Sequence, residues 1–473
     1  MLSWLTRPVT IKEKLKGRNF MPARADFYTG KTGRPLELML QARTDFLSIW
    51  RRRDFTEQVH QIRVLGRQIL IVNSPDDVRY VVAKRHENFE RKSPQMRRAL
   101  EYLLGDGLFI SDGDTWKQRR SLVNDIVHKN RVPAFGPVME RTTHELVERW
   151  SSLEDGAEVN VLHEMAGLTA EIISRSVFGN NLGKESADAV TDSFTSYQSL
   201  IDAINIGYFL GFDEGLPVWR TPTLKRSVKR IHRIIDGVVE DHLAGRGDHD
   251  SMIELLVRRQ QKNPELKLDL VALRNEAATI FMAGHETTAA TLTWAWYLLS
   301  KARWVEREVH AEIKAVCGRR TPTIDDVPKL NWCRAVIEET LRLYPPVPIL
   351  ARQAKEADVV GGIKVEPAAL VLIVPWLLHR TESLFDKPHH FRPERFLEGR
   401  PQPYSYIPFA AGPRVCPGLQ FGLTEAILCL AILAQKFVVR VPEGHVVEPQ
   451  CRLTLRPKGG LPVTLHARHK KES

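Results

Sequence analysis

Cys416 lies in the segment Phe409–Gly418, directly before an apolar stretch of about residues 419 to 437 that has the spacing of a helix. Backbone N–H groups and the dipole at a helix N-terminus favour a thiolate over a thiol. Gly412 permits a tight turn, and the two prolines of the segment stiffen it. A thiolate fixed in this way suits a soft or redox-active metal. The segment therefore predicts a metal-binding cysteine; the alternative is a buried structural cysteine before an ordinary helix.

A second group of chemically useful side chains forms the run Ala283–Thr288 (AGHETT), inside a helix predicted over about residues 269 to 299. Glycine in a helix interior costs about 1 kcal/mol relative to alanine, and threonine hydroxyls that bond the preceding turn distort a helix. The weakened helix leaves a groove for a small molecule such as dioxygen, and Glu286 beside Thr287 can relay protons into it. The alternative is a Gly/Thr-rich packing face. His285 has no partner at metal-ligand spacing and is interpreted as structural or solvent-facing.

Two further pairs have helical spacing. Glu339 and Arg342 are three residues apart, and Trp116 and Arg120 are four apart, so each pair shares one face of a helix. The first pair also arises often by chance, and an amphipathic surface helix with a half-buried tryptophan explains the second. These pairs gain a function only from the motifs around them.

Composition and charge exclude several classes of protein. The 473 residues are 43% hydrophobic and 26% charged, which allows a large core and excludes general disorder. Five cysteines without a C-x-x-C pair indicate neither a disulfide framework nor a zinc cluster, and they favour a reducing compartment. The net charge of +11 fits nucleic acid, an anionic membrane or an acidic partner, but the basic residues are scattered and no nucleic-acid motif accompanies them.

The elements that must position these residues follow from the hydrophobic pattern. Residues 59–72 predict a β-hairpin, and a helix capped by Ser74 and Pro75 follows it. A helical pattern extends from about residue 90 to residue 300. The remaining segments are predicted as helices at 303–317 and 331–343, strands at 352–375 and 437–468, and an irregular proline-rich meander at 380–415. The apolar runs fall short of the roughly 18 residues of a membrane span, and the first residues are charged too soon for an anchor.

The loop spacing Phe-x-x-Gly-x-Arg-x-Cys-x-Gly resembles the haem-ligand signature of the cytochrome P-450 family. The run at 283–288 is similar to the oxygen-activation motif of that family. The segment Phe391–Phe396 is similar to its Pro-Glu-Arg-Phe segment, and the pairs at 339/342 and 116/120 resemble its E-x-x-R and W-x-x-x-R patterns. The resemblance extends from about residue 30 to residue 467.

The resemblance implies a mainly α fold with small β-sheets (α+β), in which a helix-rich lobe and a smaller β-rich lobe surround a buried haem. It implies an N-terminal extension at 1–30, a single haem domain at 31–467 and a basic tail at 468–473.

The resemblance also assigns roles to individual residues. Cys416 is the axial ligand to the iron of haem b, and Glu286 and Thr287 are the proton relay. Residues expected to bind the haem are Trp116, Arg120, Ala283, Gly284, Arg352, Phe409, Arg414 and Gly418. Glu339, Arg342 and Arg395 form a buried structural triad that locks the meander to the core. Substrate contacts are expected from residues about 92–110, from the 195–220 stretch, and from Phe281, Met282, Val347, Ile349, Leu350 and Leu453.

The expected activity is that of a haem-thiolate monooxygenase that inserts one oxygen atom of O2 into an apolar small molecule by hydroxylation or epoxidation. Electrons would come from an external ferredoxin or flavodoxin with its NAD(P)H reductase. The expected protein is a soluble, cytoplasmic, bacterial-type monomer without a transmembrane anchor or a nucleic-acid partner. Alternatives are a peroxygenase driven by hydrogen peroxide, a haem isomerase, and a non-enzymatic haem sensor or carrier. Glu286 and Thr287 favour the monooxygenase, because the peroxygenase and the isomerase need no proton relay.

Overall fold

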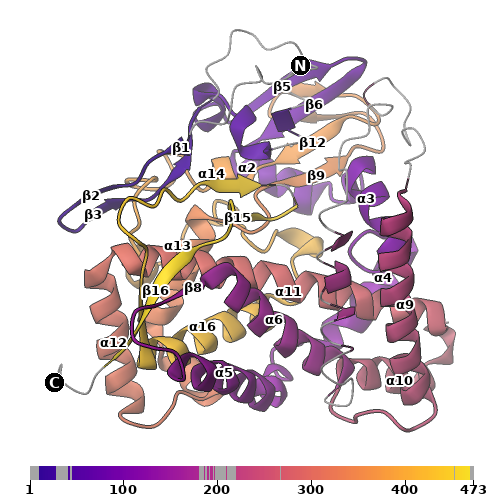
Figure 1. Ribbon diagram of the computed structural model, residues 1–473. Coiled ribbons are helices and arrows are strands. Elements are labelled where there is room, and N and C mark those ends of the chain that lie inside the picture. The colour runs from indigo at the N-terminus through magenta and orange to yellow at the C-terminus, as the bar shows by residue number, and fades with distance from the viewer. Residues whose placement is uncertain are drawn as a thin grey trace.

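The computed structural model describes residues 10–27, 41–42, 45–179, 220–266, 268–451 and 453–468, with short pieces between 186 and 209 (Figure 1). Most of the 195–220 stretch and nearly all of the basic tail therefore lie outside the described residues. A β-rich part lies at the top of Figure 1, and a larger helical part lies below it. This arrangement confirms the predicted mainly α fold with small sheets.

The helical part is built from long helices whose order follows the predicted pattern. They are α3 (Pro94–Leu104), α4 (Gly113–Ile126), α5 (Gly136–Ser151), α6 (Val161–Phe178), α9 (Pro222–Leu243), α10 (Met252–Lys262), α11 (Leu270–Lys301), α12 (Arg303–Cys317), α13 (Asn331–Leu343) and α16 (Leu419–Lys436). Helices α12 and α13 have the predicted bounds. Helix α13 ends just before Pro345, because proline cannot continue a helix.

The main sheet has the order β5-β6-β12-β9-β7. Its strands are β5 (Val59–Val64), β6 (Arg67–Val72), β7 (Arg91–Lys92), β9 (Leu350–Gln353) and β12 (Leu370–Ile373). Strands β5 and β6 form the predicted antiparallel hairpin, and β12 pairs in parallel with β6. The Ser74 hydroxyl accepts a hydrogen bond from the Asp77 N–H at 3.1 Å, so the predicted cap of α2 (Pro75–Arg79) is confirmed.

Smaller sheets complete the β structure. Strands β13 (Phe437–Arg440), β16 (Pro462–Ala467) and β8 (Ala157–Asn160) form a three-stranded sheet. The two-stranded pairs are β1 (Thr10–Ile11) with β4 (Arg24–Ala25), β2 (Lys14–Lys16) with β3 (Asn19–Met21), β10 (Asp358–Val360) with β11 (Ile363–Val365), and β14 (Pro449–Cys451) with β15 (Leu455–Pro457). The meander at 380–415 is irregular as predicted, apart from the short turns α15 (Arg395–Glu398) and η8 (Gly412–Arg414), and the one-turn α14 (Pro375–Leu378) directly precedes it.

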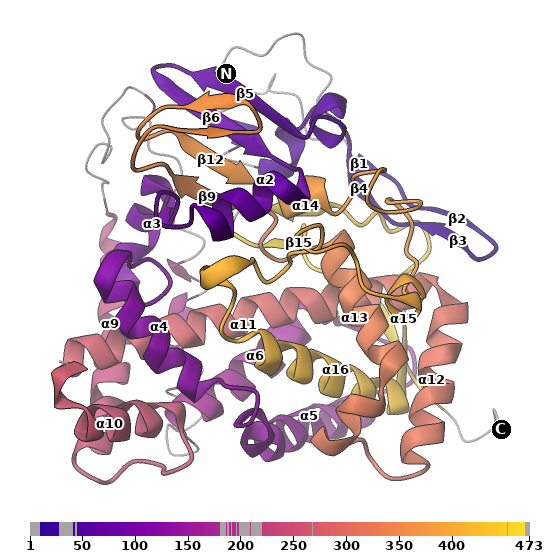
Figure 2. The same cartoon turned by 180° about the vertical axis from the view of Figure 1, so that it is seen from behind.

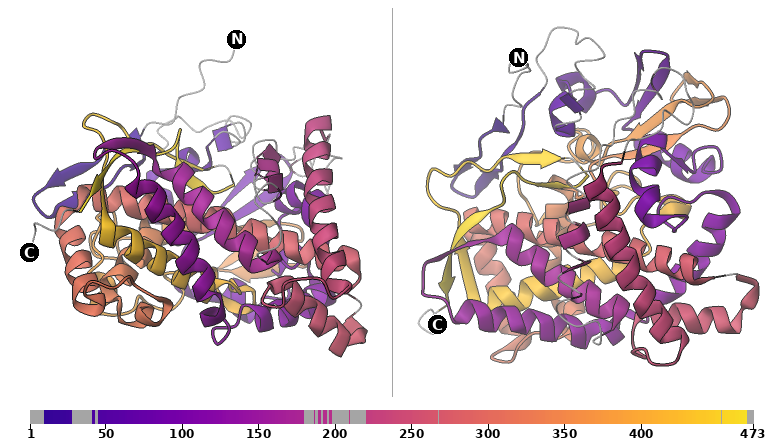
Figure 3. Two further views of the ribbon diagram at one scale, coloured as in Figure 1. Left: turned by 60° about the horizontal axis from the view of Figure 1, so that its bottom comes forward. Right: turned by 45° about the vertical axis from the view of Figure 1, so that its right-hand side comes forward.

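Helix α11 is the central element of the helical part. It packs against α6, α13 and α16, and it is seen from behind in Figure 2. Helix α9 stands across the N-terminal end of α11 (Figure 3). At this crossing Arg274 of α11 pairs with Asp236 of α9 at 3.0 Å. Near the C-terminal end of α11, the ring of Trp294 stacks on Tyr344 with centroids 3.9 Å apart. The helix is therefore held at both ends, so its middle is a rigid wall for a site.

Helix α16 bears on the prediction that the chain has no transmembrane span. By length and composition it could cross a membrane, with 18 residues and a mean hydropathy of 1.3, and it is alone in this among the described residues. The sequence prediction counted only uninterrupted apolar runs and so did not include it. The share of α16 that is buried inside the protein is 61%, against α5, α12 and α13, so its apolar character is explained by the core that it forms.

Candidate active site

One cavity brings together most of the residues that the sequence singles out. It lies between α11, α16, the α3–α4 region and the loop of Cys416, and its wall is mostly apolar. The predicted residues that line it are Trp116, Arg120, Met282, Ala283, Gly284, Glu286, Thr287, Val347, Leu350, Arg352, Phe409, Arg414, Cys416, Gly418 and Leu453. Residues from five separate stretches of the chain therefore meet in one place.

Helix α11 supplies one wall. Ala283 and Thr287 are one turn apart and face the cavity, and the Thr287 hydroxyl donates to the Ala283 carbonyl oxygen at 2.7 Å. This is the predicted bond of a threonine hydroxyl to the preceding turn, and the helix continues without interruption through the run. Packing explains why residue 284 is a glycine, because a Cβ there would lie 2.7 Å from Cδ1 of Ile173 on α6. The glycine thus lets α6 approach the wall closely.

The loop of Cys416 forms the opposite wall. Gly412 has φ of +70°, and a Cβ there would collide with the carbonyl of Val82, so the predicted tight turn is confirmed. The Cys416 N–H donates to the Phe409 carbonyl oxygen at 2.8 Å, which closes the loop. The guanidinium of Arg120 donates to the Val415 carbonyl oxygen at 2.5 Å. The loop is thereby fixed to α4 from the side.

The electrostatics of the Cys416 thiol differ from the prediction. Burial raises its pKa, against the opposing effects of a Gly418 backbone hydrogen bond and of the cations Arg120 and Lys92. The loop and the helix dipole alone therefore do not hold a thiolate. A coordinating metal ion deprotonates a thiol outright, so a bound cation would supply the missing stabilisation.

Cys429 lies on α16, the helix that follows the loop of Cys416, and has a different environment. It is fully buried in the middle of the helix, and its sulfur lies 3.3 Å from the Thr143 hydroxyl oxygen on α5. It is not among the residues that line the cavity. Of these two cysteines, only Cys416 presents its thiol to the cavity.

Four cations surround the same end of the cavity: Lys92, Arg120, Arg352 and Arg414. Burial is the largest influence on all four and lowers the pKa of each, to about 10 for Arg352 and Arg414. Arg414 also lies over the Trp116 ring, 4.4 Å from its centroid. Arg414 has a carboxylate partner in Glu90 at 3.7 Å, so the cluster keeps an excess of positive charge. Burying a charge is costly unless it is paired, so this excess fits a ligand that carries anionic groups.

These residues fit a haem. The cations match its two propionate groups, Phe409 and Gly418 border the thiol, and Cys416 offers a sulfur ligand for the iron. A Cβ at Gly418 would lie 3.9 Å from the Cys416 sulfur, so the glycine keeps the space beside the thiol open. Lys92 lies at the start of the stretch 92–110 expected to contact substrate, but its place among the haem-binding cations is not predicted, because a single lysine on a two-residue strand carries no motif.

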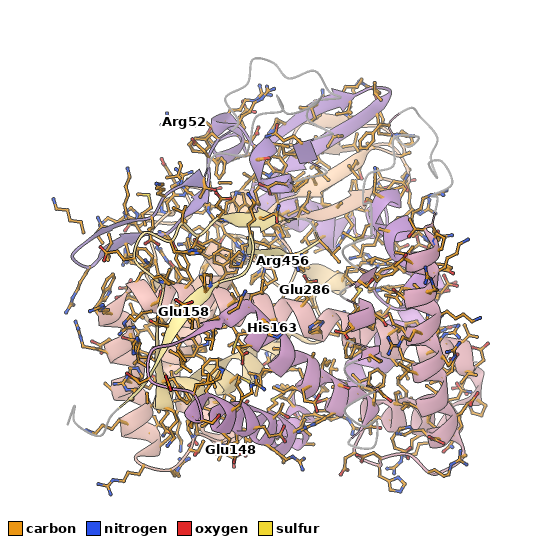
Figure 4. The ribbon with its side chains drawn as sticks, viewed as in Figure 1. Arg52, Glu148, Glu158, His163, Glu286 and Arg456 are labelled. Carbon is orange, nitrogen blue, oxygen red and sulfur yellow. The ribbon has the colours of Figure 1, made fainter. Side chains whose placement is uncertain are left out.

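Glu286 is held by the segment that leads into β15. The Thr454 hydroxyl donates to Oε1 of Glu286 at 2.6 Å, and Nη1 of Arg456 lies 3.4 Å from the same oxygen. Figure 4 shows Glu286 and Arg456 next to each other near the middle of the molecule. The sequence gives no sign of these partners, because some 170 residues separate them from Glu286.

Glu339, Arg342 and Arg395 lie together away from the cavity. Glu339 and Arg342 have no exposed side-chain surface, and Nε of Arg342 lies 2.7 Å from Oε2 of Glu339. Nε of Arg395 lies 3.1 Å from the same oxygen. Arg342 also donates to the carbonyl oxygens of Pro388 and His390 in the meander, at 2.7 Å and 3.0 Å.

Two predicted substrate contacts are wrong. Phe281 is fully buried and packs against Phe178, Phe194 and His285, because residues 281 and 285 lie on the face of α11 that points away from the cavity. Ile349 packs against the hydrophobic core and is not among the residues that line the cavity. Among the tentative contacts, Met282, Val347, Leu350 and Leu453 do line it.

Two buried acids at the cavity were missed from the sequence. Glu425 on α16 is fully buried, and burial raises its pKa well above its ordinary value. Glu276 on α11 accepts a hydrogen bond from the Leu108 N–H at 3.0 Å and lies 3.5 Å from Nε of Arg119. Burial raises the pKa of Glu276 to about 7. Single acids in apolar helices carry no sequence motif, so only the tertiary structure identifies them.

Glu276 leads to a prediction about pH. Because its pKa rises from 4.5 to about 7 on folding, the folded chain holds this proton more tightly than the unfolded chain. The stabilisation is complete below about pH 4.5 and is lost as the pH rises to about 7, a change of up to about 3 kcal/mol in the free energy of unfolding. Glu276→Gln should remove this part of the slope, measured by urea unfolding between about pH 5 and about pH 8. An equal slope in the two proteins would contradict the assignment.

Comparisons with known proteins agree with this geometry. The model of the family described as Cytochrome P-450 matches residues 37–463. Cyclooctatin synthase from Streptomyces melanosporofaciens is 30% identical over 404 residues, covering 84% of this chain and 86% of the relative. Cytokinin hydroxylase from Arabidopsis thaliana is 33% identical over 399 residues, covering 80% and 76%. The solved haem domain of cytochrome P450DA has a TM-score of 0.78 at 23% identity, covering 94% of this chain and 97% of that one, a likeness of fold.

Proposed function

The chain belongs to the cytochrome P-450 family and is a haem-thiolate monooxygenase, and we propose that it inserts one oxygen atom of O2 into a C–H or C=C bond of an apolar small molecule. The observation that carries the proposal is the meeting of Cys416, four buried or half-buried cations and the Glu286–Thr287 pair at one mostly apolar cavity. An apolar wall with a few polar groups is typical of sites for small apolar molecules.

We propose haem b as the group that this cavity holds. Cys416 would supply the axial sulfur ligand, and Arg120, Arg352, Arg414 and Lys92 would hold the propionates. When bound, the haem supplies the activation of dioxygen, and thiolate ligation favours cleavage of the O–O bond. The protein supplies placement, charge and the exclusion of water.

In this proposal Glu286 and Thr287 move protons. The Thr287 hydroxyl donates to the Ala283 carbonyl, so its oxygen lone pairs are available to the cavity. The Glu286 carboxyl also borders the cavity, and its side chain is 14% exposed. A positioned acid beside an alcohol is the arrangement that general acid catalysis requires.

The proposed electron donor is a ferredoxin or flavodoxin with its NAD(P)H reductase. The net charge of +11 supports an acidic carrier, since complementary charge accelerates encounter. We also propose a soluble, cytoplasmic, bacterial-type monomer; the match to a Streptomyces relative and the buried position of α16 support this. A spectral-shift screen of the ferric protein against apolar compounds would identify the substrate, and product formation with a surrogate ferredoxin and its reductase would test the activity.

The role of Thr287 is tested by coupling. In Thr287→Ala, haem content, the carbon-monoxide spectrum and substrate affinity should stay nearly unchanged. Product formed per NADPH should fall about two- to tenfold, the scale of one lost hydrogen bond, with a matching rise in hydrogen peroxide. Thr287→Ser keeps the hydroxyl and should stay close to the wild type, whereas Glu286→Gln should slow turnover. Unchanged coupling in Thr287→Ala would favour the alternative of a peroxygenase or an isomerase, which hydrogen peroxide as sole oxidant would then reveal.

A further inference from the structure

The side chains that hold Glu286 form a graded path from the cavity to solvent. Thr454 is 6% exposed and lines the cavity together with Glu286. The side chain of Glu286 is 14% exposed, and that of Arg456 is 40% exposed. Arg456 is not among the residues that line the cavity. The Glu286 carboxyl therefore stands between the cavity on one side and a solvent-exposed guanidinium on the other.

The backbone that carries Thr454 and Arg456 is fixed at Leu455. The Leu455 N–H donates to the Pro346 carbonyl oxygen at 3.0 Å, and the indole N–H of Trp294 on α11 donates to the Leu455 carbonyl oxygen at 3.0 Å. Leu455 itself is fully buried. Because side chains alternate along an extended segment, Thr454 and Arg456 share the face opposite to Leu455. This face meets α11 at Glu286.

We propose that Thr454 and Arg456 are positioning residues for the proton donor Glu286, and that protons enter the site from solvent beside Arg456. This inference rests on the proposed function. The Glu286 carboxylate takes up a proton from solvent, passes it toward Thr287 and becomes again the carboxylate that pairs with Arg456, so the side chain is unchanged over a cycle and supplies no electrons. The Thr454 hydroxyl and the Arg456 guanidinium both approach Oε1, which fixes the direction of the carboxyl group.

A purely structural role for this contact makes a different prediction. If the ion pair of Arg456 with Glu286 only held the β14–β15 hairpin in place, its loss would lower the stability of the protein without changing the amount of product formed per NADPH. The chain offers a matched control on the same hairpin, because Lys458 pairs with Glu448 at 2.9 Å with its side chain 58% exposed. Lys458→Gln removes a hairpin cation and its ion pair without touching Glu286.

The experiment compares Arg456→Gln, Arg456→Lys, Thr454→Val and Lys458→Gln in the haem-loaded protein. Ethoxycoumarin serves as an apolar probe with a surrogate ferredoxin and reductase, and product and hydrogen peroxide are counted per NADPH. Arg456→Gln should lower product per NADPH about two- to fivefold, the scale of a half-exposed ion pair. Thr454→Val should lower it about two- to tenfold, the scale of one hydrogen bond. Arg456→Lys keeps the positive charge and should retain most of the wild-type product per NADPH. Lys458→Gln should give the same product per NADPH as the wild type.

A double variant separates this inference from the proposed function. Once Glu286→Gln has removed the acid, adding Arg456→Gln should cost nothing further, because residues that act through one another are not additive. If Glu286→Gln turns over like the wild type, the proposed proton role of Glu286 is wrong. If Glu286→Gln is slow but Arg456→Gln and Thr454→Val couple normally, or if Lys458→Gln loses as much as Arg456→Gln, only the positioning inference is overturned.

Discussion

Cys416→Ala is expected to lose the strongly red-shifted Soret band of the reduced, carbon-monoxide-bound protein, and with it all turnover. The band reports a sulfur ligand to haem iron, and Cys416 is the cysteine that lines the cavity. The haem of the Cys416→Ala protein, where any remains, should show the carbon-monoxide spectrum of a protein without a thiolate ligand.

The controls are alanine substitutions at Cys317, Cys333, Cys429 and Cys451, all of which are buried. Cys429→Ala is the sharpest of them, because this residue lies on the same helix that follows Cys416 and contacts Thr143 instead of the cavity. Each control should keep the red-shifted band. A band that survives Cys416→Ala and disappears in Cys429→Ala would overturn the assignment of the ligand.

The features predicted correctly are those that depend on the spacing of residues close together in the sequence. The loop around Cys416, the hairpin at 59–72, and the helices that carry Trp116 and Glu339 depend on neighbours a few positions away. A tight turn that needs a positive φ is indicated by a glycine, and the end of a helix is indicated by a proline, so both can be recognised from the sequence. The family spacing then associates these segments with one cavity.

The errors have a different physical origin. Phe281 and Met282 are adjacent on α11, and a rotation of about 100° per residue decides which of them faces the cavity. Lys92, Glu276 and Glu425 are single charged residues that tertiary packing brings to the site from separate elements. The raised pKa of Cys416 follows from burial, which a sequence does not show. Charge and orientation at the site are therefore properties of the packed structure.

Glu339→Ala or Arg342→Ala should yield little soluble haem protein. Both side chains are fully buried, and Arg342 makes two charge-assisted bonds to Glu339, with Nε at 2.7 Å and Nη2 at 2.8 Å. The Arg392 N–H, in the meander, donates to Oε1 of Glu339 at 2.9 Å. Removing one partner leaves a buried charge unpaired, at a cost of about 3–5 kcal/mol. That cost is a large share of the roughly 5–15 kcal/mol that holds a domain folded.

In Arg342→Ala, the loss of stability should come from the freed meander as well as from the unpaired charge of Glu339. Arg342 bonds the carbonyl oxygens of His379, Pro388 and His390, so its removal frees three points of the segment that leads to the loop of Cys416. Arg342→Lys keeps the charge but cannot make this set of planar bonds, so it should recover only part of the yield. Arg392→Ala is the matched control: its side chain is 35% exposed, and its ion pairs with Asp386 and Glu398 should be worth less than about 1 kcal/mol. Soluble yield, haem content and the urea midpoint measure the effect. A folded, haem-loaded Arg342→Ala protein that differs from the wild type only in turnover would show that these residues act in the reaction and are not needed for the fold.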